Sequence, residues 1–104
     1  MMRFRAIAFG LTLVGLIFAV PSYLLAYSGE KLAKGAKVSI DEARAIALKA
    51  QRGTISDEEL EREKGGSGLR YSFDIKGTGG VYEVGVDAQT GRVLENKKEG
   101  RHPD

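Results

Sequence analysis

The chain of 104 residues contains no cysteine, no tryptophan, two prolines and a single histidine. Without cysteine it has no disulfide bonds, no thiol nucleophile and no cysteine-based zinc site. His102 lies beside Pro103 close to the carboxyl end, where no scaffold would hold it as a general base. We therefore expect no enzyme activity, no catalytic residues, no metal ligands and no cofactor.

An excess of positive charge is also missing from most of the chain. Sixteen lysines and arginines stand against fourteen acidic residues, and Arg3 and Arg5 are the only charged residues before Glu30. From Glu30 onward the two signs balance at fourteen each. A nucleic-acid-binding surface built on a basic face is therefore not expected.

The amino-terminal region has the composition of an export signal. Residues 6–20 are uncharged and almost wholly apolar, and they follow the short positive start. This order is typical of a secretory signal peptide, and Pro21 ends the apolar run. Cleavage is expected after Ala26 or after Ser28, and residues 1–28 are assigned to the leader.

A second interpretation keeps this segment as a membrane anchor. Residues 6–27 are uncharged and, at about 1.5 Å per residue, reach roughly 33 Å, enough to cross a bilayer. Three lysines follow within residues 31–37, so the flanking charges do not decide the orientation. Both interpretations export the same domain. A cleaved signal would release it into the periplasm or the exterior, and a retained anchor would hold it on the outer side of the inner membrane.

The exported part begins with a polar stretch and then a helix. Residues 29–37 contain two glycines and no apolar period, which predicts a linker. Ser39 followed by Glu42 forms a capping-box pattern, which predicts a helix over residues 40–51. Its apolar positions recur at spacings of three and four: Ile40, Ala43, Ile46, Ala47 and Ala50.

The carboxyl-terminal half alternates with a period of two, as in half-buried antiparallel strands. A turn signal at residues 77–80 joins two such strands into a hairpin. Residues 87–91 predict a second turn, in which Asp87 caps the loop amides and Gly91 takes the left-handed conformation before a short strand over residues 92–95. The residues expected to face the core are Leu69, Tyr71, Phe73, Ile75, Tyr82, Val84 and Val86.

Residues 54–64 carry conflicting signals. A second capping-box pattern and a run of strong helix formers favour a helix. Only Ile55 and Leu60, five residues apart, would face a core. The acidic run over residues 57–63 lacks the spacing of a calcium loop, so a solvated charged strand is favoured over a cation site.

The assembled pattern resembles a PepSY domain over residues 38–97. The resemblance is carried by VSIDEA at residues 38–43, AIAL at residues 45–48, LERE at residues 60–63, Tyr71, and YEVGVDAQTGRVL at residues 82–94. It implies that residues 58–63 form a strand, against their helix propensity. It also implies a module that binds and restrains peptidases, in cis as a propeptide or in trans as a separate protein.

We therefore expect an α+β domain at residues 38–97, with one helix on a three- or four-stranded antiparallel sheet and a disordered tail at residues 98–104. Its expected function is an exported non-enzymatic binding module acting on a peptidase or other envelope protein. The alternative is a membrane-tethered accessory or sensor domain that responds to cations or envelope conditions. The candidate interaction face consists of outward strand residues: Glu59, Glu61, Arg70, Ser72, Asp74, Glu83 and Gly85.

Overall fold

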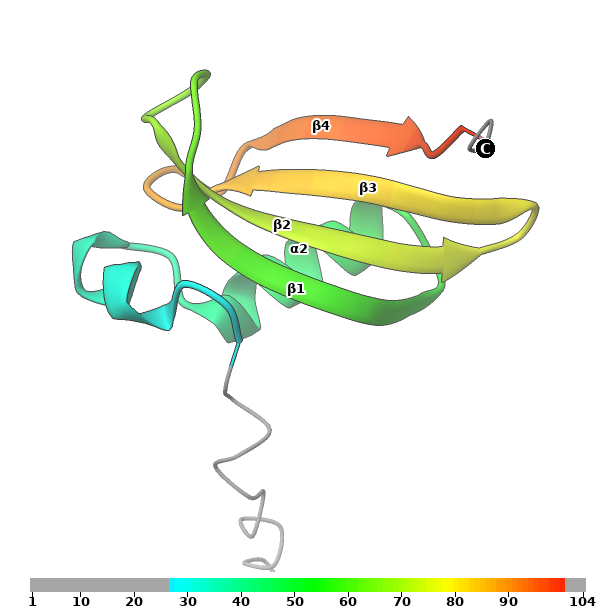
Figure 1. Ribbon diagram of the computed structural model, residues 1–104, viewed down its shortest axis with the longest axis horizontal. Helices are drawn as coiled ribbons and strands as arrows, with labels where there is room; N and C mark the ends of the chain where they lie inside the picture. Colours follow the sequence, from blue (N-terminus) through cyan, green and yellow to red (C-terminus); the bar gives the residue numbers. More distant parts are fainter. Residues whose placement is uncertain (1–26, 101–104) are drawn as a thin grey trace, which may run out of the picture.

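The computed structural model describes residues 27–100 (Figure 1). The predicted leader up to Ala26 and His102 with its neighbours lie outside the described residues. The elements in chain order are the 3-10 helix η3 (Glu30–Gly35), the helix α2 (Ile40–Ala50) and the strands β1 (Thr54–Arg62), β2 (Leu69–Gly77), β3 (Gly80–Asp87) and β4 (Val93–Lys98).

The four strands form one antiparallel sheet in the order β1-β2-β3-β4, so each strand pairs with its neighbour in sequence. The helix α2 lies on one side of this sheet, and it contacts β2, β3 and β4 (Figure 1). The α+β architecture is confirmed, with four strands and a last strand that continues to Lys98.

The helix begins where its capping signal predicted. The Ser39 hydroxyl accepts a hydrogen bond from the Glu42 N–H at 3.1 Å, and the Glu42 carboxylate accepts one from the Ser39 N–H at 2.9 Å. These two bonds satisfy amides that the first turn leaves unpaired. After the helix, Gly53 has φ +151°, and a Cβ there would lie 2.2 Å from the Lys76 carbonyl oxygen. Only glycine permits this close approach as the chain turns into β1.

The acidic segment after Gly53 is a nine-residue strand, so the helical propensity of residues 54–64 is overridden. A β-bulge at Ser56 explains how two apolar residues five apart serve the same core. Ile55 lies opposite Ile75 and Leu60 lies opposite Tyr71, and both partners point toward α2. Without one extra residue, a spacing of five would place them on opposite faces.

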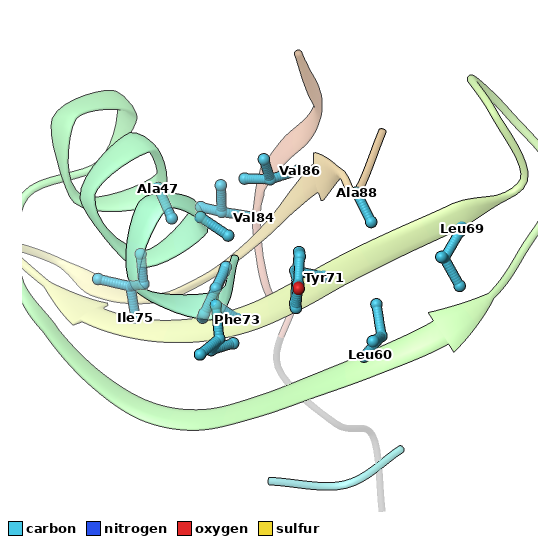
Figure 2. Close-up of a cluster of buried hydrophobic side chains, with 11 residues drawn as sticks. Ala47, Leu60, Leu69, Tyr71, Phe73, Ile75, Val84, Val86 and Ala88 are labelled. Carbon is cyan, nitrogen blue, oxygen red and sulfur yellow. The ribbon is translucent and has the colours of Figure 1, made fainter. Parts of the chain in front are cut away.

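The core lies between α2 and the sheet, and Figure 2 shows Ala47 pointing toward the strand residues. Tyr71 donates a hydrogen bond from its hydroxyl to the Val38 carbonyl at 2.7 Å, so its polar atom is satisfied inside the core. Tyr82, expected to face the core, is only half-buried. The buried apolar residues are Ile40, Ala43, Ala47, Leu60, Leu69, Tyr71, Phe73, Ile75, Val84, Val86 and Ala88.

The predicted linker is instead part of the packed domain. Residues 30–35 form η3, and Leu32, Ala33 and Ala36 pack against the core. The Lys37 and Val38 amides both donate to the Ala88 carbonyl, at 3.0 and 2.9 Å. The sequence concealed this role because so short a segment shows no apolar period.

Candidate functional site

The side of the sheet turned away from α2 brings the predicted interaction residues together. The pairing register places Glu59 opposite Ser72, and Ser72 opposite Gly85. In the neighbouring rows, Glu61 lies opposite Arg70, and Asp74 opposite Glu83. We call this side the open face. Its role in binding stays a prediction.

The open face carries more negative charge than the sequence analysis assigned to it. Asp57 lies opposite Asp74 on it, and Glu95 lies opposite Gly85. β4 could not be assigned to this face from sequence because the bulge between Gly85 and Val86 sets its register. The carboxylates on this side are Asp57, Glu59, Glu61, Glu63, Asp74, Glu83, Asp87, Glu95 and Glu99, and the cations at outward positions are Arg70, Lys76 and Lys97.

This crowding affects the ionisation of two central carboxyls. Burial raises the pKa of Asp74, and the negative charges of Glu99 and Asp57 raise it further. Burial also raises the pKa of Glu83, with Glu95 as the next cause. Both shifts mean that the folded domain disfavours the ionised form of these carboxyls, first through burial and then through the neighbouring negative charges.

Arg70 and Gly85, which were predicted as interaction residues, lie on the open face but are buried. Arg70 is only 7% exposed. Its guanidinium contacts Glu95 at 3.2 Å and donates to the Lys64 carbonyl at 3.1 Å. A Cβ on residue 85 would lie 3.2 Å from the Arg70 Cδ, so the glycine gives the arginine room to lie flat across the sheet. The two residues form the floor of the face.

Asp87 is also buried, with 2% of its surface exposed. Its carboxylate accepts hydrogen bonds from the N–H and hydroxyl of Ser67, at 2.7 and 2.8 Å. It accepts two more from the amides of Gln89 and Thr90, at 2.8 and 3.2 Å, as predicted for the turn. Burial alone would raise the pKa of Asp87, but these bonds outweigh it and lower the pKa to about 2.

The glycine-rich loop over residues 65–68 is therefore anchored to the turn that joins β3 and β4. Gly66 has φ +56°, and a Cβ there would lie 2.2 Å from an Asp87 carboxylate oxygen. Because Gly66 has no side chain, the loop can close directly over the Asp87 carboxylate. In the hairpin of β1 and β2, which this loop connects, Arg62 lies opposite Leu69.

An open groove of about 510 Å³ runs beside β1, and at its side Arg44 pairs with Glu58. The Arg44 Nη2 lies 2.6 Å from Glu58 Oε2, and its Nε lies 2.8 Å from Glu58 Oε1. The bulge at Ser56 places Glu58 on the side of α2, where it meets this arginine. The groove is lined by Tyr27, Ser28, Arg44, Ile55, Ser56, Asp57 and Glu58.

Two features are absent from residues 27–100. In this range no three histidine, cysteine or acidic side chains are grouped as metal ligands. Nor does the same range contain a helix with the length and apolar character needed to span a membrane. The alternative of an anchored domain depends on residues 6–27, almost all of which lie outside the described part of the chain.

The fold and its two unlike faces define the class of this protein. It is a small α+β module in which a helix covers one face of a four-stranded antiparallel sheet and the other face presents ordered charged side chains. The family model of PepSY, described as peptidase propeptide and YPEB domain, matches residues 37–97. The chain therefore belongs to the PepSY family, which confirms the resemblance.

Family membership sets the general character of the domain. PepSY is a propeptide-type domain that is generally non-catalytic, and its members are typically found in exported proteins. No curated protein and no solved structure matches the chain.

Proposed function

We propose that this chain is an exported, non-enzymatic binding module that restrains or regulates a peptidase or another protein of the cell envelope in trans. The description of its family as a peptidase propeptide domain supports this proposal. The matched segment spans α2 and all but the last residue of β4, so the whole module is present.

The observation that carries the proposal is the open face of the sheet. Its side chains stand on hydrogen-bonded strands, so binding them requires little additional ordering of the backbone. Glu59 is exposed, and Glu61, Ser72, Asp74 and Glu83 are partly exposed above the floor made by Arg70 and Gly85.

The charge of the open face specifies the partner surface. Carboxylates outnumber cations on it, although the chain from Glu30 onward is balanced. A partner that presents lysine and arginine side chains would relieve the repulsion that adds to the effect of burial on the pKa of Asp74 and Glu83. We therefore expect binding that weakens as salt is added.

The experiment is capture of envelope proteins by the exported chain carrying a carboxyl-terminal tag, followed by measurement of affinity and of peptidase activity. A peptidase should be retained, and its activity should change when the module binds. Failure to retain a peptidase or any other envelope protein would contradict the proposed function.

A matched pair of charge reversals tests the role of the open face. Glu59→Lys places a positive charge on this face, and Glu30→Lys makes the same change on η3, where the side chain is also exposed. We expect Glu59→Lys to weaken binding roughly tenfold, which corresponds to about 1.4 kcal/mol. Glu30→Lys should change it less than about twofold. Equal affinities for the two variants would show that the partner binds elsewhere.

A further inference from the structure

The sequence leaves two positions for removal of the leader, after Ala26 and after Ser28. The local residue types favour the second position slightly, because it has small residues both directly before the cut and two residues earlier. The structure favours the first position, because the mature domain uses Tyr27, Ser28 and Gly29 in its fold and a cut after Ser28 would remove two of them.

We propose that an export-associated signal peptidase cuts the bond between Ala26 and Tyr27, so that Tyr27 is the first residue of the mature protein. This inference concerns maturation and holds whatever partner the open face binds.

Tyr27 contributes to the core through its ring. The Tyr27 and Tyr71 ring centroids are 6.3 Å apart, and the Tyr27 side chain packs against the buried cluster. Its carbonyl accepts a hydrogen bond from the Glu30 N–H at 3.3 Å. A cut after Ser28 would remove this ring from the core.

Ser28 pairs with the outer edge of β1. Its carbonyl accepts the Leu60 N–H at 2.8 Å, and it forms a parallel bridge to Glu59. Leu60 is only 1% exposed, so loss of Ser28 would leave a backbone donor without this acceptor at a buried position.

Gly29 shows that the chain is shaped to pass closely over β1 at this point. It has φ +82°, and a Cβ there would lie 1.9 Å from the Leu60 carbonyl oxygen. Its own carbonyl accepts the Leu32 N–H at 2.8 Å and so starts η3. A mature chain that began at Gly29 would place a charged, freely rotating amino terminus where the backbone now needs one conformation.

The proposed cut preserves all of these contacts. Hydrolysis consumes one water molecule and leaves a carboxylate on Ala26 and an α-ammonium group on Tyr27. The new positive charge lies at the groove beside β1, which Asp57 and Glu58 also line.

The test is the amino terminus of the full chain after export by a bacterial host, read by intact mass and by amino-terminal sequencing. We expect mature protein that begins at Tyr27. Mature protein that begins at Gly29, or recovery of the intact chain from Met1, would overturn the proposal.

Two variants separate the candidate positions. Ser28→Arg puts a large charged residue directly before the second position, while the exposed Ser28 side chain leaves its backbone pairing free to form. We expect this variant to be processed as efficiently as the parent, with Tyr27 first. Accumulation of uncut Ser28→Arg chain would show that the cut follows residue 28. Ala26→Arg should accumulate uncut chain, and unchanged processing of that variant would also contradict the proposal.

Discussion

At the scale of single residues, the two charged side chains buried in the sheet owe their burial to what lies over or beneath them. Asp87 is covered by the loop over residues 65–68 and is satisfied by hydrogen bonds from Ser67 and the following turn. Arg70 rests on Gly85 and pairs with Glu95. A buried charge is tolerated only when such partners replace its water. The two residues lie opposite each other, so they order the end of the open face where β2 begins and β3 ends.

Replacing Asp87 by asparagine tests this anchoring. The substitution removes the charge that four donors share, and we expect the free energy of unfolding to fall by about 2 to 3 kcal/mol in urea titrations at pH 7. Asp41→Asn is the control, since that carboxylate is 74% exposed and contacts only Arg44 at 2.8 Å, and should cost about 0.5 kcal/mol. Equal losses in the two variants would show that the hydrogen bonds to Asp87 stabilise the domain no more than one exposed ion pair does.

The same carboxyl predicts an acid sensitivity. Its pKa is about 2 in the folded protein against a usual value of 3.8, so the ionised form stabilises the fold above pH 4. This contribution is lost as the pH falls from about 4 to about 2, and amounts to about 2 kcal/mol. Unfolding titrations over this range should show the loss in the parent chain, and Asp87→Asn should show a clearly shallower dependence.

At the scale of elements, two local devices decide how α2 and β1 present their residues. The capping box starts α2 at Ile40, so that Ala43 and Ala47 meet the sheet. The bulge at Ser56 brings Ile55, Glu58 and Leu60 to the side of the sheet that α2 covers. The open face then receives Asp57, Glu59 and Glu61. Each device uses few residues, and each determines which side chains are available for binding.

Ser39→Ala should remove one of the two capping bonds and weaken the other. We expect a loss of about 1 kcal/mol in the free energy of unfolding. Ser39→Asp should retain most of the stability, because aspartate is an equally good capping residue. A stable Ser39→Ala domain, or an Asp variant as weak as the Ala variant, would contradict the capping argument.

Deletion of Ser56 tests the bulge. Ile55 would then directly precede Asp57. Ile55 would stay opposite Ile75 on the side of α2, and Asp57 would stay opposite Asp74 on the open face. We expect a folded domain that has lost about 1 kcal/mol or less. Deletion of Glu59 is the comparison, because it turns Glu58 to the open face and away from Arg44. That deletion should cost about 2 kcal/mol or more, since Arg44 loses the two-point contact with the Glu58 carboxylate.

At the scale of the whole molecule, the distribution of charge is the feature that the total charge conceals. The exported region is balanced overall, yet carboxylates outnumber cations on the open face. Lysines lie instead on η3 and around α2, at Lys31, Lys34 and Lys49. Such a separation of charge lowers the stability of the free domain. A partner of opposite charge restores this stability when it binds.

Asp74→Asn should therefore stabilise the free domain at neutral pH. The pKa of Asp74 is raised in the folded state, so its ionised form opposes folding and the opposition fades as the pH falls. We expect a gain of roughly 0.5 kcal/mol at pH 7 that disappears at pH 3. Weaker binding of a basic partner by this variant should accompany the gain. A variant less stable than the parent at pH 7 would contradict the proposed repulsion.

The sequence by itself determined the features that depend on neighbouring residues. Ser39 and Glu42 marked the start of the helix, and alternation identified β2, β3 and their inward residues, because capping and strand periodicity act over a few positions. The interaction face was assigned to one side of the sheet by the same alternation. That assignment is reproduced in the register, from Glu59 opposite Ser72 to Asp74 opposite Glu83.

Only the tertiary structure decided the features that join distant segments. Residues 54–62 are a strand because pairing with β2 outweighs their helix propensity; the family resemblance predicted a strand at residues 58–63, but local propensity favoured a helix. Asp87 is buried because Ser67, twenty residues away, folds over it, and residues 27–36 are packed because the core extends beyond α2. Local signals are short-ranged, whereas burial depends on what the rest of the chain brings to the same place.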